Sequence, residues 1–113
     1  MKQIIAVIKP HMLVEVEHAV YDLPHFPGFT LLRSKGHGRG RAPGHAHHPL
    51  EWGLDEQDNA TLLIVCSNEL APQVVEAIQS SAHTGLPGDG IISVTEAVEV
   101  VRIGSGERGD TAV

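Results

Sequence analysis

The sequence predicts one α+β domain over residues 1–113, with the ferredoxin-like order βαββαβ and an antiparallel sheet. Segments with strand character occur at four places: residues 3–8, 29–35, 60–66 and 91–94. Two segments with helical spacing of apolar residues separate the first strand from the second and the third from the fourth. Two helices on one face of such a sheet leave its other face bare, and we expect oligomerisation to cover it.

The first half of the chain begins with the apolar strand candidate QIIAVI at residues 3–8. Pro10 ends this strand and suits the first turn of a helix, where its missing N–H is not needed. The helix predicted over residues 11–22 has apolar residues at spacings of three and four: Leu13, Val16, Ala19, Val20 and Leu23. Two prolines and a glycine at residues 24–28 then predict a turn before the strand at 29–35.

The second half resumes with the strand ATLLIVC at residues 60–66, which is apolar enough to be covered on both faces. Ser67 or Asn68 is the predicted cap of a second helix, which runs to about Ala82. The apolar face of this helix consists of Leu70, Val74, Val75 and Ile78. A glycine-rich turn at residues 84–90 precedes the fourth strand, which residues 98–103 continue or follow as a short fifth.

Charge and composition exclude several classes of protein. The net charge is −6, and no Lys or Arg occurs from residue 42 to residue 101, which argues against a nucleic-acid partner. No apolar run approaches the roughly 18 residues of a membrane span, so we expect no membrane insertion. No signal peptide precedes the first strand, and the single cysteine, Cys66, fits a reducing cytoplasm as a buried, inert thiol.

The stretch at residues 36–58 is rich in glycine and histidine and has no apolar periodicity. A connection this long inside a compact domain is uncommon, and it is usually functional or disordered. Its charge is polarised, because residues 23–50 carry four cations and no carboxylate, whereas residues 51–58 carry four carboxylates and no cation. We therefore interpret 36–58 as the working part of the protein and the remainder as its frame.

Four local patterns, in the same order and at matching separations, resemble one family, the PII signal-transduction proteins (nitrogen regulatory protein P-II). They are Ile-Ile-x-x-Ile-Lys-Pro at residues 4–10, Lys-Gly-x-Gly-Arg at 35–39, Thr-Gly-x-x-Gly-Asp-Gly-Ile at 84–91, and Val-Arg-Ile through Gly-Glu to Asp-x-Ala-Val at 101–113. The resemblance runs from end to end. It implies a homotrimer of ferredoxin-like subunits that signals by binding a protein target, without catalysis.

The resemblance also implies three functional loops: the T-loop at 36–58, the B-loop at 84–90 and the C-terminal loop at 102–113. Adenine nucleotides bind in clefts between subunits of such proteins, and their phosphates are held by a backbone anion nest and by arginines. The corresponding residues of this chain are Gly38, Arg39, Thr84, Gly85, Gly88, Asp89, Gly90 and Arg102.

Several departures from the family pattern reduce the positive charge of this expected site. Ile91 and Gly104 stand where the family has a lysine and a second arginine, and Asn59 and Leu63 replace an expected lysine and glutamate. A triphosphate carries about four negative charges, and buried charge without partners is costly. We therefore expect ADP, AMP or no nucleotide in place of ATP.

The switch by covalent modification is also predicted to be absent. Trp52 occupies the position of the tyrosine that is nucleotidylated in many relatives, and Leu50 occupies the alternative serine position. Neither side chain has a hydroxyl group to modify.

Four of the eight histidines lie in the 36–58 stretch, and imidazole is the commonest protein ligand for late transition metals. Residues two apart in extended chain point the same way, so His45 and His47 can approach one ion together. With His48, and with His37, Glu51 or Asp55 to complete the set, they form a candidate site for Ni²⁺, Cu²⁺, Zn²⁺ or Co²⁺. The alternative is a flexible polar loop tip without metal, and the other four histidines are expected on the surface of helices or turns.

Three functions follow from these patterns. The first is a PII-like trimeric regulator whose metal-binding loop controls a partner such as a membrane transporter, for instance in heavy-metal efflux. The second is an ADP or AMP sensor that regulates nitrogen or carbon metabolism without tyrosine modification. The third, a small metal-dependent hydrolase, is disfavoured because the sequence has no dedicated nucleophile.

Overall fold

The fold has the predicted element order and is ferredoxin-like. The computed structural model describes residues 1–38 and 56–113, and the statements below concern these residues. The main elements are β1 (Lys2–Ile8), α1 (Leu13–Tyr21), β2 (Thr30–His37), β3 (Glu56–Cys66), α2 (Ala71–Ala82) and β4 (Gly90–Glu96). Short 3₁₀ helices occupy Pro10–Met12 and Gly109–Ala112.

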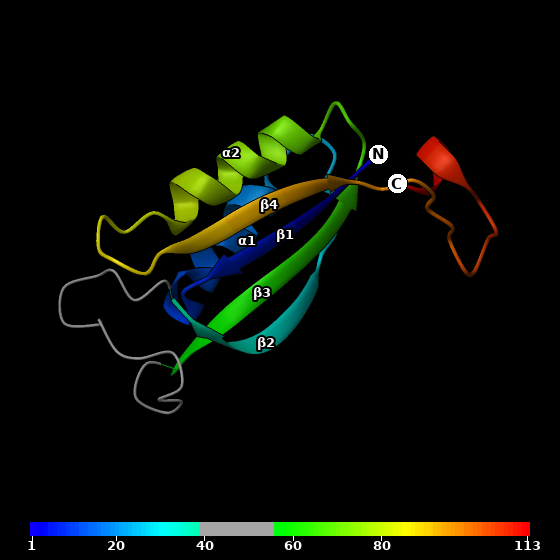
Figure 1. The fold of residues 1–113 in the computed structure, drawn as a ribbon. Coiled ribbons are helices and arrows are strands. Elements are labelled where there is room, and N and C mark those ends of the chain that lie inside the picture. Colours follow the sequence, from blue (N-terminus) through cyan, green and yellow to red (C-terminus); the bar gives the residue numbers. More distant parts are fainter. Residues whose placement is uncertain (39–55) are drawn as a thin grey trace.

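The four strands form one antiparallel sheet in the order β2-β3-β1-β4. β1 therefore lies in the interior of the sheet, and its last residue, Ile8, pairs with Ala60 of β3 and with Gly90 of β4. This register places the end of β1 beside the start of β4, so the residues that follow β1 lie next to the turn that precedes β4 (Figure 1).

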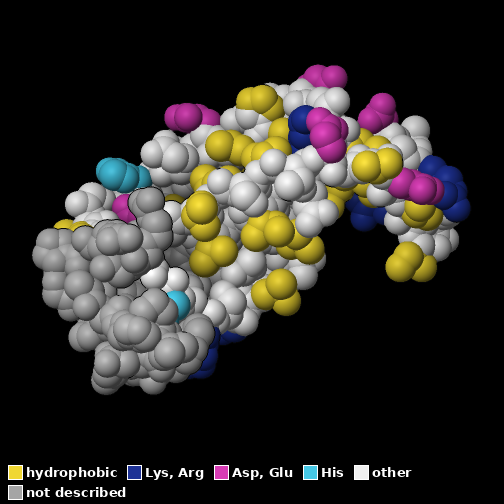
Figure 2. All heavy atoms as spheres, in the orientation of Figure 1, with side chains coloured by type: hydrophobic (Ala, Val, Ile, Leu, Met, Phe, Trp, Pro, Cys, Tyr) yellow, Lys and Arg dark blue, Asp and Glu magenta, His cyan; other side chains and the backbone are white. Residues whose placement is uncertain are grey.

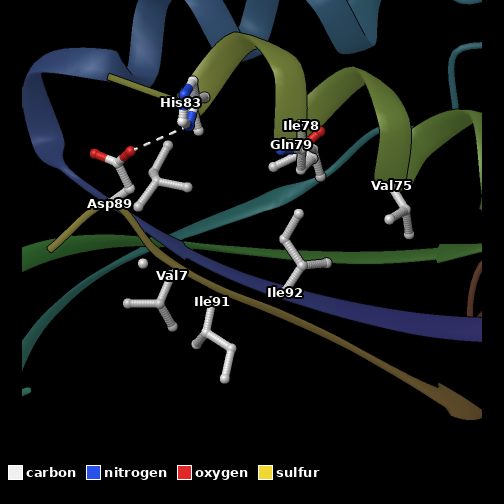
Figure 3. A pocket seen from close by; sticks show the side chains of 11 residues that line it. Val7, Val75, Ile78, Gln79, His83, Asp89, Ile91 and Ile92 are labelled. Atoms are coloured by element: carbon white, nitrogen blue, oxygen red, sulfur yellow. Dashed lines mark ion pairs between the residues drawn. The ribbon is translucent and has the colours of Figure 1, made fainter. Parts of the chain in front are cut away.

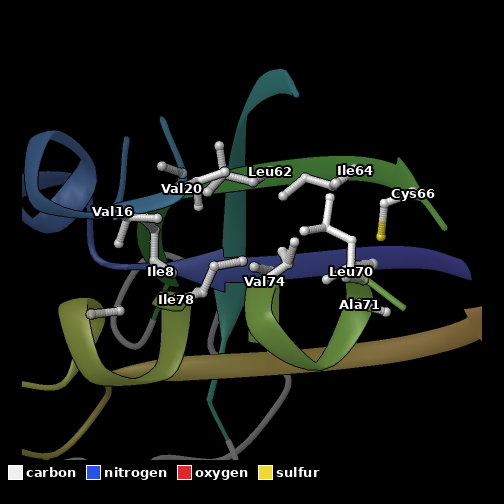
Figure 4. Close-up of a cluster of buried hydrophobic side chains, with 14 residues drawn as sticks. Ile8, Val16, Val20, Leu62, Ile64, Cys66, Leu70, Ala71, Val74 and Ile78 are labelled. Carbon is white, nitrogen blue, oxygen red and sulfur yellow. The ribbon is translucent and has the colours of Figure 1, made fainter. Parts of the chain in front are cut away.

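Both helices lie on one face of the sheet, and the hydrophobic core is between them and the strands (Figure 4). The alternating residues Ile4, Ala6 and Ile8 of β1 point into it and are at most 2% exposed. The other main contributors are Val16 and Val20 of α1, Leu62 and Ile64 of β3, and Val74 and Ile78 of α2. Cys66 is buried as predicted, and desolvation raises the pKa of its thiol.

No helix of the described residues covers the opposite face of the sheet, as the predicted architecture requires. Ile5, Leu32 and Ile91 on this face are 37%, 52% and 67% exposed. Figure 2 shows hydrophobic side chains gathered over the sheet in this view. A bare apolar sheet face is a feature of proteins that associate.

Several element boundaries differ from those predicted. β2 extends to His37 and β3 begins at Glu56, two and four residues beyond the predicted ends, because antiparallel backbone pairing continues into polar residues. Lys35 Nζ and Asp58 Oδ1, which face each other across these strands, are 3.1 Å apart. The connection is therefore shorter than 36–58 by the paired residues at each end.

The ends of the helices and the C-terminal segment also differ from the prediction. α1 starts at Leu13 after the 3₁₀ turn, and α2 starts at Ala71, where the next residue, Pro72, favours a first helical turn. Ser67 accepts a hydrogen bond from the Leu70 N–H through its hydroxyl at 3.2 Å, but it lies before the helix and does not cap it. Residues 98–103 form no strand apart from one bridge between Val101 and Arg108.

In the part of the chain that the structure describes, neither helix has the length and apolar character required to cross a membrane.

Candidate functional site

The 84–90 turn connects α2 to β4 and has three glycines with left-handed backbone angles. The φ angles of Gly85, Gly88 and Gly90 are 82°, 86° and 113°. Glycine-rich turns with such angles are a kind of backbone that can form an anion-binding nest. The requirement is strictest at Gly90, where a Cβ atom would lie 1.8 Å from the Val7 carbonyl oxygen of the neighbouring strand.

Hydrogen bonds of the Asp89 and Thr84 side chains connect the two ends of the turn. Asp89 Oδ2 accepts a hydrogen bond from the Thr84 backbone N–H at 2.8 Å, and Asp89 Oδ1 accepts another from the Thr84 hydroxyl. The Leu86 N–H donates to the same hydroxyl oxygen at 3.1 Å. The hydrogen bonds from the Thr84 hydroxyl and, next, from its backbone N–H hold the pKa of Asp89 well below its usual range. Burial acts in the opposite direction, and Lys9 lowers the pKa by a smaller amount. Asp89 is therefore ionised near neutral pH and fixes the shape of the turn.

Lys9 brings a positive charge to this carboxylate from the end of β1. Its Nζ lies 3.2 Å from Asp89 Oδ1 and 3.3 Å from the Thr84 hydroxyl oxygen. The two charged side chains are only 20% and 24% exposed, so solvent screens them less than a surface pair. This contact joins the turn to the sheet.

A groove of about 410 Å³ runs between α2 and β4 and ends at the turn (Figure 3). Val75 and Ile78 of α2 and Ile92 of β4 make its floor apolar. Its polar end is formed by His83 and Asp89, whose Nδ1 and Oδ2 atoms are 3.5 Å apart. The groove therefore meets the 84–90 turn at its polar end.

The base of the long segment lies beside the same turn. Gly88 is close enough that a Cβ atom there would be 3.8 Å from both Gln57 Oε1 and Lys9 Cε. Gln57 lies in β3, opposite Gly36 of β2, at the point where the two strands lead into the segment. The turn and the base of the segment are therefore close neighbours in space.

Arg102 is not brought to the turn within one chain. Its Nε donates a hydrogen bond to the Ala112 carbonyl at 2.7 Å, and its backbone N–H donates to Glu107 at 2.9 Å. These contacts hold Arg102 in the C-terminal segment. This segment follows the end of β4, whereas the turn precedes its start (Figure 1). The seven residues of β4, at about 3.3 Å each, separate the two by roughly 20 Å.

The predicted metal ligands are only partly within the described residues. His37 ends β2 opposite Glu56, whereas His45, His47 and His48 lie outside the described residues, as does Arg39. Residues 1–38 and 56–113 contain no cluster of three or more His, Cys, Asp or Glu side chains suited to a metal ion. Gly38, the last residue before the undescribed stretch, is exposed.

Comparison with known sequences gives one consistent result. A sequence model described as nitrogen regulatory protein P-II matches residues 1–107. Nitrogen regulatory protein P-II of Azospirillum brasilense is 39% identical over 113 residues, with 100% of both chains covered. The protein of that name from Rhodospirillum rubrum is 36% identical with the same coverage. Nitrogen regulatory protein P-II 2 of Methanothermobacter thermautotrophicus is 36% identical and is covered over 97% of its length.

The chain belongs to the P-II family. Membership confirms the resemblance drawn from the four sequence patterns and assigns the chain to a family of nitrogen regulatory proteins. In this P-II chain, Ile91 directly follows the turn, and its side chain is 67% exposed.

The sequence patterns did not single out Lys9 or His83 as neighbours of Asp89 in this P-II chain. Lys9 was visible as the lysine of the first pattern, but there it marked only the end of a strand. His83 was predicted to lie on the surface, and it is exposed, yet it also contacts Asp89. The remaining histidines predicted on the surface, His11, His18 and His25, are exposed as well.

Proposed function

We propose that this chain is a P-II regulator that binds an adenine nucleotide at the 84–90 turn and signals its occupancy to a protein target through the 36–58 segment. The observation that carries the proposal is the closure of the turn by Asp89 and Thr84, which gives a preformed, glycine-rich backbone cradle. Its closeness to Gln57 at the base of the segment supplies a physical link between ligand and reporter. The chain works by binding, with no catalytic step.

The active form is a homotrimer. Two observations support assembly: the uncovered apolar face of the sheet, and the separation of Arg102 from the turn of its own chain. A neighbouring subunit can supply Arg102 to a turn that its own chain cannot reach. The nucleotide then lies between subunits, where it is sensitive to how they pack.

The preferred nucleotide is ADP or AMP. Lys9 already compensates the charge of Asp89, so this pair adds no net positive charge to the turn. Ile91 adds none where the family resemblance places a lysine. Each phosphate beyond the first must therefore be balanced by arginines outside the turn, which disfavours a triphosphate.

Calorimetry with AMP, ADP and ATP on the purified chain tests this function. The expected result is measurable binding of ADP or AMP and at least about tenfold weaker binding of ATP, since tenfold corresponds to roughly 1.4 kcal/mol. Thr84→Val, which removes the hydroxyl that bonds Asp89, should weaken binding of all three. Micromolar or tighter binding of ATP would overturn the assignment of nucleotide.

A transition metal bound by His45, His47 and His48 is a second proposed ligand. The observation that favours it is the position of His37, which ends β2 where the chain enters the segment with the other three histidines. Metal binding would restrict that segment and change its fit to a target such as a membrane transporter. The test is limited proteolysis with and without Ni²⁺: replacement of the three histidines by alanine should abolish any metal-dependent protection while the oligomer persists.

We place this regulator in the cytoplasm, with a protein as its target. The pathway is either heavy-metal efflux or nitrogen or carbon metabolism. If a transition metal changes target binding, the first is favoured; if an adenine nucleotide changes it, the second is favoured. A pull-down of candidate transporters with added ADP, and separately with added Ni²⁺, tests this point.

A further inference from the structure

Lys9 contacts both Thr84, the first residue of the 84–90 turn, and Asp89, its last residue but one. Its backbone is extended, with φ −67° and ψ 134°, as a residue before proline prefers. From there its Nζ reaches Thr84 and Asp89, and its Cε lies 3.8 Å from where a Cβ atom of Gly88 would be. The side chain of Lys9, the residue after β1, thus supports a turn whose own residues lie far along the chain.

This ion pair differs from an ordinary surface pair. In the Lys2–Glu96 pair, at the other end of β1, the glutamate side chain is 66% exposed. Exposed pairs of this kind contribute little to stability, because water and salt screen them. Lys9 and Asp89 are both largely sheltered, and Asp89 is also held by two hydrogen bonds from Thr84. Loss of Lys9 would therefore leave a sheltered carboxylate without its cation.

We propose that Lys9 is the positioning residue of the anion-binding turn, an inference that rests on the nucleotide function proposed above. The turn needs the ionised Asp89 to hold Thr84, yet that same negative charge repels a phosphate. Lys9 neutralises it from the β1 side and fixes the turn against the sheet. Its charge is therefore used to shape the turn and to cancel Asp89, and the phosphates are left to the backbone and to arginine.

The experiment compares Lys9→Met, Lys9→Arg and Lys2→Met with the unmodified protein. Met keeps the length of the side chain without the charge, Arg keeps the charge, and Lys2→Met removes the charge of a lysine in β1 that also forms an ion pair. Two quantities are measured: the ADP dissociation constant by calorimetry, and the hydrogen exchange of residues 84–90 without nucleotide. Lys9→Gln replaces Lys9→Met if the methionine variant does not fold.

Lys9→Met should weaken ADP binding about tenfold or more, as expected for loss of a hydrogen bond between charged groups, and should speed exchange in the turn. Lys9→Arg should restore most of both, and Lys2→Met should change neither. Unchanged exchange and unchanged ADP binding in Lys9→Met would overturn the inference. If the unmodified protein does not bind ADP, the nucleotide function fails, and faster exchange in Lys9→Met alone would still support the positioning role.

Discussion

Gly90 leaves no room for a side chain beside Val7, because a Cβ atom at Gly90 would lie 1.8 Å from the Val7 carbonyl oxygen. The contact is with backbone in the interior strand of the sheet, which cannot move aside without breaking its pairing with β3. The φ angle of 113° at Gly90 is also one that other residues rarely adopt. The entry from the 84–90 turn into β4 therefore depends on glycine.

Gly90→Ala should consequently lower the free energy of unfolding by about 3 kcal/mol, through steric overlap together with backbone strain. Urea denaturation at a fixed protein concentration measures this, since the stability of an oligomer depends on concentration. Gly104→Ala is the matched control, because nothing lies within 4 Å of its added Cβ atom. Equal stability of the two variants would contradict the role assigned to Gly90.

Gly36→Ala is expected to have a much smaller effect. A Cβ atom at Gly36 would lie 2.5 Å from Asn59 Nδ2, which is the end of a flexible side chain and can rotate away. We expect a loss below about 1 kcal/mol in the free energy of unfolding, within the range of most mild substitutions. The same denaturation experiment checks it, and the double variant Gly36→Ala/Asn59→Ala should recover the loss if the side-chain overlap is its cause.

The contribution of Asp89 to stability should depend on pH. Its pKa is depressed in the folded state by the hydrogen bonds from Thr84, so the unfolded chain binds its proton more readily. The stabilisation is present above the ordinary aspartate pKa of about 3.9 and is lost as pH falls toward the folded value. The difference in free energy of unfolding between the natural protein and Asp89→Asn should therefore be largest near pH 7 and should shrink below pH 4.

Glu96→Gln provides the comparison for this pH experiment. The hydrogen bond from Lys2 lowers the pKa of Glu96 as well, but its side chain is 66% exposed. Solvent screening should make its pH-dependent contribution smaller than that of Asp89. A larger effect at Glu96 would show that the sheltered network of the turn is not the main acid-sensitive element.

The order of elements could be predicted from the sequence because short apolar runs mark the strands and helical spacing of apolar residues marks α1 and α2. The extension of β2 to His37 could not, because polar residues carry no periodic signal and their pairing follows from backbone register. The glycine-rich pattern around Asp89 predicted the turn at residues 84–90. The contact with Lys9 was missed because it depends on the pairing of β1 with β4, which brings together residues distant in the chain.

Ile91→Lys should improve ATP binding relative to ADP. Ile91 directly follows the turn at the start of the edge strand β4 and is 67% exposed in the single chain, so a lysine there adds a positive charge without disturbing the core of the subunit. One charge-assisted contact with a phosphate is worth about 1.5–3 kcal/mol, so we expect roughly a tenfold or greater gain in ATP affinity. Calorimetry with ATP and ADP, at one salt concentration, measures the change in their ratio.

Gln73→Lys separates a local effect at the turn from a general effect of net charge. Gln73 is exposed near the start of α2, the end of the helix remote from the turn, so it adds the same charge on the same chain away from the turn and outside the C-terminal segment. Only Ile91→Lys should shift the ratio of ATP to ADP affinity, because the interaction of exposed charges fades beyond about 10 Å at 0.1 M salt. Equal shifts of this ratio in both variants, or no shift in either, would mean that the phosphates do not lie at the 84–90 turn. The isoleucine at position 91 would then have no bearing on which nucleotide is bound.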